Sequence, residues 1–340
     1  VGSVTSDQYA SIAADTDGLI IDGVSNLGGL TIGADGGYIT NSAGDAGTSV
    51  RFEVDSGDFE INGPVTIYGY DVTVADSGSA SSFGTKSGNM LLKAGNDVLL
   101  NGPVKATSST LTLDAGGTVT QTAALTADNL ALSGTGDFTL TNSGNNVVTL
   151  AGGSSGTRLG EVEYLDEDAL TIGAVNPTGL TSSGDIFVAT AAGDLTISEA
   201  VETASTSATA IVFAAGTDAS AGGSGAPGTG NIVISGSPNL SVGDGGTIAL
   251  YTGDVSGSTG LTELVGSDSG NFRYHTSIDA SGTVTAGYTT ALATDTPNAL
   301  YREQPTVTGD ASFDAASIVY GEDLPGTSSS GISGLVNGDT

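Results

Sequence analysis

The single histidine, His275, is the residue on which a nucleophilic mechanism in this chain would depend. A Ser/His/Asp triad would have to use it, and Ser267, Asp268 and Ser269 lie close to it in the sequence. Nothing resembling a Gly-x-Ser-x-Gly motif at a strand-to-helix turn supports such a triad. A metal site built on two imidazoles is excluded within one chain. We therefore favour a structural or surface role for His275.

Paired carboxylates could instead support acid–base chemistry. Glu161 with Glu163, or Asp166 with Asp168, would lie on one side of a strand. Hydrolysis of a glycosidic bond needs two carboxyl groups about 5–9.5 Å apart. Lyases of acidic sugars need basic groups, and seven Lys and Arg residues are dispersed through the whole chain. The alternative is a solvated acidic loop, so we predict that the chain is not an enzyme.

Calcium is the ion that the sequence favours most. Asp35, Asp114 and Asp244 each precede small residues and glycine, which places a carboxylate beside an open corner. Oxygen ligands suit hard cations, but aspartate before glycine is also common in ordinary turns. The nonapeptide calcium repeat and the Gly-rich phosphate loop followed by Lys are both absent from the sequence. We predict no cofactor other than this calcium candidate.

Any such group must be positioned by the fold, which a repeated sequence pattern predicts. Between residues 90 and 150, short alternations of apolar and polar residues end in a small residue and glycine about every 20 residues. Alternation at period 2 predicts strands, and repetition at this period is typical of a solenoid. The sequence therefore predicts an all-β fold, a parallel β-helix of about 12 rungs. Parallel crossovers are generally right-handed, so we expect that hand.

The composition restricts the partners. The chain has 340 residues, no Cys, 38 acidic and seven basic residues, and a net charge of −31. Nucleic acid and anionic membrane surfaces are disfavoured, because both are bound through basic residues. No apolar run reaches the 18 residues of a transmembrane helix. The chain begins at Val1, so we interpret it as a processed product or a piece of a longer protein. The high negative charge keeps a protein soluble, and we expect it to act outside the cell.

The pattern also predicts a domain organisation. Residues 1–17 form a lead-in or cap, residues 18–270 the β-helix, residues 271–303 an aromatic-rich cap, and residues 304–340 a small β segment. Residues 158–168 interrupt the repeat, and we expect a wider corner or an inserted loop there.

Several phrases resemble the filamentous-haemagglutinin-like exoproteins of bacteria, which are giant secreted adhesins. The phrases are Asn-Gly-Pro-Val-Thr-Ile at 62–67, Asn-Pro-Thr-Gly-Leu-Thr at 176–181, Gly-Asn-Phe-Arg-Tyr at 270–274 and Leu-Tyr-Arg-Glu-Gln-Pro-Thr at 300–306. In such proteins the last phrase leads into small β-sandwich-like or β-grasp-like repeats with Tyr-Gly-Asp and Gly-Leu-Val-Asn-Gly-Asp motifs. Residues 318–323 and 334–339 look like these motifs, although Glu322 stands where the family usually has Asp.

The resemblance implies a secreted or cell-surface structural or adhesive protein, in a fibre or a biofilm matrix. We expect partners among copies of the same chain, a host or neighbouring cell surface, or a polysaccharide. The last repeat stops at Thr340, before a small domain would be complete, so the segment either docks on a neighbouring copy or the sequence ends inside a domain. The residues expected to assemble are Pro305, Val307, Ile318, Val319, Tyr320, Leu335 and Val336. The alternative function is a carbohydrate-active β-helix enzyme or a polysaccharide-binding module.

Overall fold

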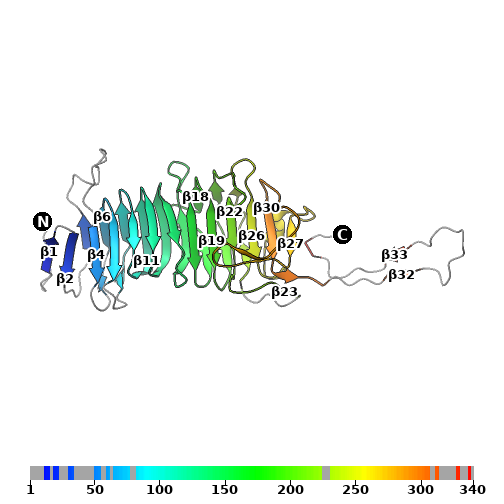
Figure 1. Ribbon diagram of the computed structural model, residues 1–340, viewed down its shortest axis with the longest axis horizontal. Coiled ribbons are helices and arrows are strands. Elements are labelled where there is room, and N and C mark those ends of the chain that lie inside the picture. Colours follow the sequence, from blue (N-terminus) through cyan, green and yellow to red (C-terminus); the bar gives the residue numbers. More distant parts are fainter. Residues whose placement is uncertain are drawn as a thin grey trace.

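The computed structural model describes residues 11–15, 18–22, 30–33, 50–54, 59–61, 64–76, 82–223, 230–306, 311–313, 327–329 and 336–337, with side chains in 64–75, 82–222, 230–306 and 336–337. Figure 1 shows the strands stacked side by side along the longest axis of the molecule. Apart from one short helix, the described elements are all strands.

The first of two long sheets has 11 strands, and every neighbouring pair in it is parallel. In spatial order its strands are β4 (Val50–Val54), β7 (Val72–Asp76), β10 (Val98–Leu100), β12 (Thr118–Gln121), β14 (Asp137–Leu140), β16 (Val162–Asp166), β19 (Ile186–Thr190), β22 (Ile211–Ala214), β26 (Ile248–Thr252), β30 (Pro297–Tyr301) and β27 (Phe272–Tyr274).

The second long sheet has 14 strands, which are also parallel. Its main path runs through β3 (Leu30–Gly33), β6 (Val65–Gly69), β9 (Met90–Ala94), β11 (Val104–Ala115), β13 (Leu125–Gly134), β15 (Asn146–Gly152), β17 (Leu170–Ile172), β20 (Leu195–Ile197) and β24 (Ile232–Ile234). Beside this path lie β5 (Phe59–Ile61), β8 (Phe83–Thr85), β18 (Leu180–Ser182), β21 (Val201–Thr203) and β25 (Leu240–Ser241).

Together the two sheets make a parallel β-helix solenoid, which confirms the predicted fold class. A rung carries two or three strands, one in the 11-stranded sheet and the others in the 14-stranded sheet. The right-handed sense of the winding stays a prediction. No helix in the described part of the chain is long and apolar enough to cross a membrane.

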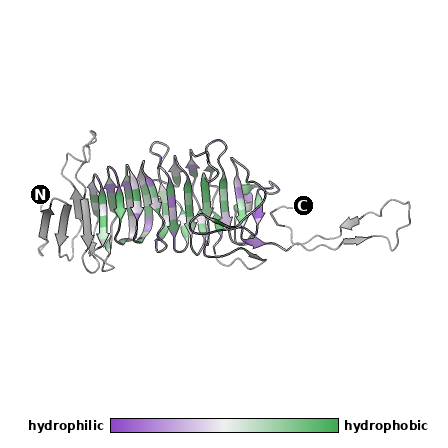
Figure 2. Ribbon diagram, viewed as in Figure 1, coloured by the Kyte–Doolittle hydropathy of each residue, from purple (hydrophilic) through white to green (hydrophobic). Residues whose placement is uncertain are grey.

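The core is a set of apolar columns parallel to the axis. Strands β6 and β9 bury every second residue, as the alternation predicts. Residues in register on successive rungs stack on one another inside the solenoid, and one such column consists of Val65, Met90, Leu111, Leu130, Leu150, Ile172 and Ile197. Figure 2 shows the hydrophobic colour concentrated on the strands. Each apolar side chain buried in this way contributes roughly 1.5–3 kcal/mol, which a single rung cannot accumulate in sufficient number.

The corners between strands depend on glycine and asparagine. Gly134 has a φ of 90°, and a Cβ on it would overlap the carbonyl oxygen of Ala115 on the preceding rung. Asn145 is fully buried at another corner. Its Nδ2 donates to the carbonyls of Leu140 (3.0 Å) and Leu165 (3.1 Å), and its Oδ1 accepts from the Leu125 N–H (3.1 Å). One amide side chain thus satisfies the main chain of three rungs.

Our expectation of a wider corner or an inserted loop at residues 158–168 is wrong for most of that segment. Residues 162–166 form strand β16, which pairs with β14 and β19. Val162 and Tyr164 are buried in the core, while the side chain of Glu163 points to the other face. The excursion comes earlier, where Ser154 and Thr157 form an isolated antiparallel bridge. The acidic composition hid a strand whose alternation is intact.

The two ends of the solenoid are built differently. At one end β1 (Ser11–Asp15) and β2 (Gly18–Asp22) form an antiparallel pair. At the other end α1 (Leu261–Val265) contacts β24 and β30, with Leu261 buried in the core. Strands β30 and β27 belong to the same sheet as the preceding rungs. The domain boundaries at residues 17, 270 and 303 stay predictions.

Candidate functional site

Two rows of residues line the outer face of the 11-stranded sheet. In register along one row are Thr139, Glu163, Phe187, Val212, Ala249 and Asn298. Along the other are Leu165, Ala189, Ala214, Tyr251 and Leu300. From β19 onwards both rows are largely apolar, and strands β22 and β26 are buried on both faces.

A segment between β27 and β30 covers this apolar part of the outer face. It begins with the antiparallel pair β28 (Ser277–Ile278) and β29 (Val284–Ala286), and its Ile278, Ala280, Tyr288 and Leu292 pack against the sheet in a second hydrophobic cluster. Burial, followed by the neighbouring Tyr288, raises the pKa of the Tyr251 phenol beneath the segment. We call residues 275–296 the outer cover.

The tip of the outer cover is fixed by one carboxylate. Asp279 Oδ1 accepts hydrogen bonds from the Ser281 hydroxyl (2.6 Å), the Ser281 N–H (2.9 Å) and the Thr283 N–H (3.0 Å). The Ser281 bond is the main reason why the pKa of Asp279 lies below its ordinary value. Gly282, with a φ of 80°, is placed so that a Cβ on it would contact the Phe187 ring at 3.5 Å. The tip of the outer cover therefore lies against the Phe187 ring, and the cover extends no further along the sheet.

Beyond the tip the outer face is hollow. An open depression of about 400 Å³ lies between the sheet and the outer cover. Its lining residues are Thr141, Glu163, Leu165, Phe187, Ala280 and Ser281. An aromatic ring, aliphatic groups, hydroxyls and one carboxylate thus line the same depression.

Carboxylates surround this hollow. Burial, then the charges of Glu163, Asp185 and Asp137, raise the pKa of Glu161. The main-chain N–H of Glu161 donates to Asp137 Oδ1 at 2.8 Å. At Asp185, burial acts to raise the pKa, but hydrogen bonds from nearby serine and threonine hydroxyls lower it overall. The surroundings of the hollow are strongly negative.

Asp166 and Asp168, the other predicted carboxylate pair, have separate roles. Asp166 is fully buried and accepts hydrogen bonds from the Tyr164 hydroxyl (2.6 Å) and the Val147 N–H (3.0 Å). Asp168 is exposed, and its N–H donates to Asp166 Oδ1 at 3.2 Å. Burial raises the pKa of Asp166 to about 7. The Asp166 carboxyl therefore accepts main-chain N–H groups at a corner of the solenoid. The amide of Asn145 has the same kind of role on another rung.

The raised pKa of Asp166 makes stability depend on pH. In the unfolded chain the group titrates near pH 4, so between about pH 4 and pH 7 the unfolded state has lost the proton that the folded state keeps. Stability should therefore fall as pH rises through this window and stay level above it, by up to about 4 kcal/mol. The measurement is the urea midpoint of the wild type and of Asp166→Asn between pH 4.5 and 8.5.

The control for this pH series is Asp244→Asn, which removes an exposed carboxylate from a turn. This substitution changes the overall repulsion among acidic groups very little. The pH dependence of the variant's stability should therefore match that of the wild type. The pH dependence of Asp166→Asn should be shallower than both. Equal slopes in all three proteins would show that Asp166 is not the group responsible.

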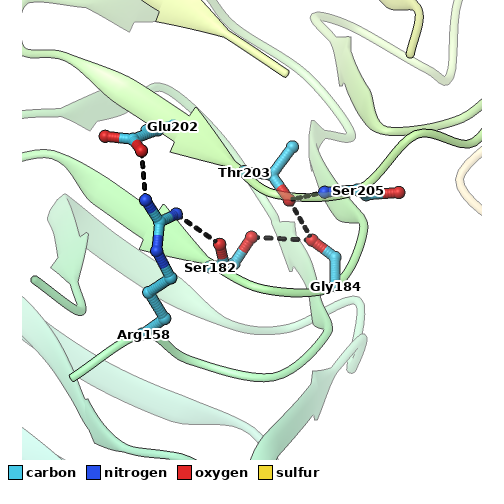
Figure 3. A network of polar contacts seen from close by, with 6 residues as sticks. All are labelled: Arg158, Ser182, Gly184, Glu202, Thr203 and Ser205. Atoms are coloured by element: carbon cyan, nitrogen blue, oxygen red, sulfur yellow. Dashed lines mark hydrogen bonds and ion pairs between the residues drawn. The ribbon is translucent and has the colours of Figure 1, made fainter. Parts of the chain in front are cut away.

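A polar network links three rungs at another corner, as Figure 3 shows. Arg158 pairs with Glu202 on β21 and donates to the Ser182 carbonyl on β18 at 2.9 Å. Ser182 and Thr203 both donate to the Gly184 carbonyl, at 2.7 and 2.5 Å. The network is partly exposed, and its members bond to one another across neighbouring rungs. We therefore assign it a structural role.

At the end of the solenoid the Tyr301 ring stacks against two other aromatic rings. The Tyr301 ring lies 5.5 Å from that of Tyr274 and 6.5 Å from that of Phe272. Asn337 reaches this end from the last part of the chain, where its side chain accepts from the Thr262 hydroxyl (2.6 Å) and donates to the Tyr274 hydroxyl (3.0 Å). The end of the solenoid thus carries a docking position for the C-terminal segment.

The predicted calcium residues are dispersed. Asp114 lies in β11, where Lys93 Nζ contacts its carboxylate at 2.6 Å and supplies the positive charge. Asp244 is exposed in a turn, and Asp35 lies outside the described residues. Within the described ranges no group of three or more His, Asp or Glu residues could hold a metal ion. Calcium binding stays a prediction without a built site.

The predicted assembly residues are described only in part. Pro305 and Val336 are half-buried, and Val336 lies next to the docked Asn337. The remaining five lie outside the described residues, namely Val307, Ile318, Val319, Tyr320 and Leu335. β31 (Glu303–Gln304), just before Pro305, pairs with β23 (Gly222–Gly223), and the chain later contains the antiparallel pair β32 (Ala311–Phe313) and β33 (Thr327–Ser329).

His275 is exposed, and its main-chain N–H donates to the Glu303 carbonyl at 3.0 Å. Among the described residues no hydrogen bond joins its ring to Ser267, Asp268 or Ser269. The geometry thus gives no support to a triad.

The predicted aromatic-rich cap at residues 271–303 contains the outer cover, but the sequence analysis did not anticipate that this segment lies on the outer face of the sheet beside Phe187. A signal was present, because Ile186–Ala189, Ile211–Ala214 and Ile248–Tyr251 are continuous apolar runs rather than alternations. Strands buried on both faces produce such runs. No family model matches this chain, and neither a curated protein nor a solved structure matches it.

Proposed function

We propose that this chain is a secreted or cell-surface structural and adhesive rod, which assembles end to end through residues 305–340. The observation that carries the proposal is the stack itself. Two parallel sheets continue without interruption from one end of the solenoid to the other, so the molecule has a stiff axis and two ends (Figure 1). Such a shape suits a fibre or a matrix component.

The docking of Asn337 supports the part of the proposal that concerns the C-terminal segment. Thr262 and Tyr274, at the end of the solenoid, hydrogen-bond to a residue 75 and 63 positions away. The side chain of Asn337 is almost completely buried by this contact. In an assembly, the segment of one copy would make these contacts with the end of a neighbouring copy in place of its own end.

The charge of −31 sets the conditions for assembly. Like-charged copies repel each other over about 10 Å at 0.1 M salt and over about 3 Å at 1 M. Assembly should therefore increase with ionic strength, as expected for a protein that works in a saline extracellular medium.

Electron microscopy of the purified protein at high salt tests the proposal. The full chain should form filaments, and a variant that ends at Gln304 should give isolated rods of unchanged circular dichroism. Asp244→Asn serves as a control that leaves the segment intact. Filaments that persist without residues 305–340, or a full chain that stays monomeric at all salt concentrations, would refute it.

A further inference from the structure

The hollow beside the outer cover lies at the border of the packed interface, so that Leu165, Phe187 and Ala280 of that interface line it together with the polar residues Thr141, Glu163 and Ser281. The outer cover packs on the apolar rows from β16 to β30, and the hollow begins where that packing stops. Its floor is formed by Glu163 and Leu165 on β16, its rim by the exposed Thr141 just after β14, and its other side by Ala280 and Ser281 at the tip of the cover. The space is open to solvent on the side away from the cover.

The side chains in the hollow offer a flat apolar face opposite polar groups. Phe187 is half-buried, since Gly282 rests on part of its ring. The Glu163 carboxylate, also half-buried, makes no hydrogen bond or ion pair to any described residue, while the neighbouring Asp137 and Asp185 have hydrogen-bond donors. Thr141 and Ser281 add hydroxyl groups. Glu163 is therefore the acceptor that a ligand in the hollow would meet.

The charge around the hollow selects the ligand class. The charges of Glu163, Asp185 and Asp137 all act on Glu161, so four carboxylates make this side of the solenoid negative. An anionic ligand would be repelled at this position, and a cation would be attracted. A cation with an apolar face can also stack on an aromatic ring.

We propose that the hollow binds a positively charged sugar unit, an amino sugar with a free protonated amine, within a polysaccharide. The sugar ring lies against Phe187, the ammonium group pairs with Glu163, and the hydroxyls of Thr141 and Ser281 bond to the sugar hydroxyls. The hollow, about 400 Å³, has room for one such ring. Binding at this site does not require assembly, so it can be tested on isolated rods.

Calorimetric titration with a glucosamine trisaccharide tests the inference, and the N-acetylated trisaccharide is the matched neutral ligand. The wild type should bind the free-amine form with one site per chain. Glu163→Gln should weaken binding about 10- to 100-fold, because a charge-assisted hydrogen bond is lost. Thr141→Trp, at an exposed position on the rim, should abolish binding by filling the hollow without removing a buried contact.

A charge control separates this site from general attraction to an acidic protein. Glu199→Gln removes one carboxylate outside the lining of the hollow and should bind the trisaccharide as the wild type does. Equal weakening in Glu199→Gln and Glu163→Gln would overturn the inference, as would unchanged binding in Thr141→Trp. Equal affinity for the N-acetylated trisaccharide, or no binding of either sugar, would also overturn it. Filament formation is a separate measurement, so either proposal can fail alone.

Discussion

Replacing Arg302 with alanine is expected to loosen the C-terminal end of the solenoid far more than replacing a surface arginine. Arg302 is 3% exposed, and its guanidinium donates to the carbonyls of Ala215 and, at 2.7 Å, Gly230. These carbonyls lie at the two ends of the chain segment between β22 and β24. The Arg302 side chain therefore joins the two ends of this segment. Burial lowers the pKa of Arg302 to about 10, which leaves it charged at neutral pH.

The size of the effect follows from the groups left behind. Two buried carbonyls lose their donors in Arg302→Ala, and each orphaned group costs about 1–3 kcal/mol. We expect a loss of about 3 kcal/mol in the free energy of opening this end. Arg302→Lys should restore little, because an ammonium group lacks the planar fork that reaches both carbonyls.

Hydrogen exchange measures this opening directly. The amides of Gly222 and Glu303 bond to the carbonyls of Arg302 (3.1 Å) and Gly253 (3.1 Å), beside the substituted residue. Their protection should fall about 100-fold in Arg302→Ala, while amides of β9 and β11 stay protected. The control is Arg158→Ala, which breaks a partly exposed pair and should cost less than about 1 kcal/mol. Equal losses in both variants would contradict the role of Arg302.

The strands of the solenoid were predictable because their physics is local and repeated. An alternation such as Met90–Ala94 fixes which side chains face the core, and repetition about every 20 residues fixes that rungs stack. The segment with acidic residues at 161–168 was predicted wrongly because composition was given more weight than period. Its Val162 and Tyr164 keep the alternation, and Tyr164 hydrogen-bonds the buried Asp166.

The hollow was not predictable from the sequence alone. The continuous apolar runs in β22 and β26 indicate that something covers their outer face. The covering segment, residues 275–296, lies inside the predicted aromatic-rich cap, but its scattered apolar residues do not indicate which face of the solenoid it covers. The position of this segment depends on long-range packing. How far the side chains of Phe187 and Glu163 are exposed depends on where the tip of the segment ends.

The phrase at residues 300–306, on which the family resemblance chiefly depended, has a structural use in this molecule. Tyr301 stacks with Tyr274, Arg302 holds a loop base, and Glu303 accepts the Val255 N–H at 2.9 Å. These contacts explain the phrase as a closure of the solenoid. The likeness to the exoproteins remains a resemblance, and the β-helix fold is compatible with it.

The stacking of rungs is the premise of the rod, the end-to-end assembly and the hollow alike, and the absence of Cys makes it directly testable. Thr171 on β17 is in register with Thr149 on β15 and Thr196 on β20. Strands in register lie about 4.8 Å apart, and strands two rungs apart lie about 9.6 Å apart. A short bifunctional thiol reagent can therefore distinguish the two spacings.

We expect Thr171→Cys with Thr196→Cys, and Thr149→Cys with Thr171→Cys, to be cross-linked within one chain almost completely, as measured by mass spectrometry of the linked peptides. Thr149→Cys with Thr196→Cys, at twice the spacing, should remain unlinked under the same conditions. Each double variant should keep the circular dichroism of the wild type. Efficient linkage of the distant pair, or none in the two adjacent pairs, would contradict the stacked solenoid.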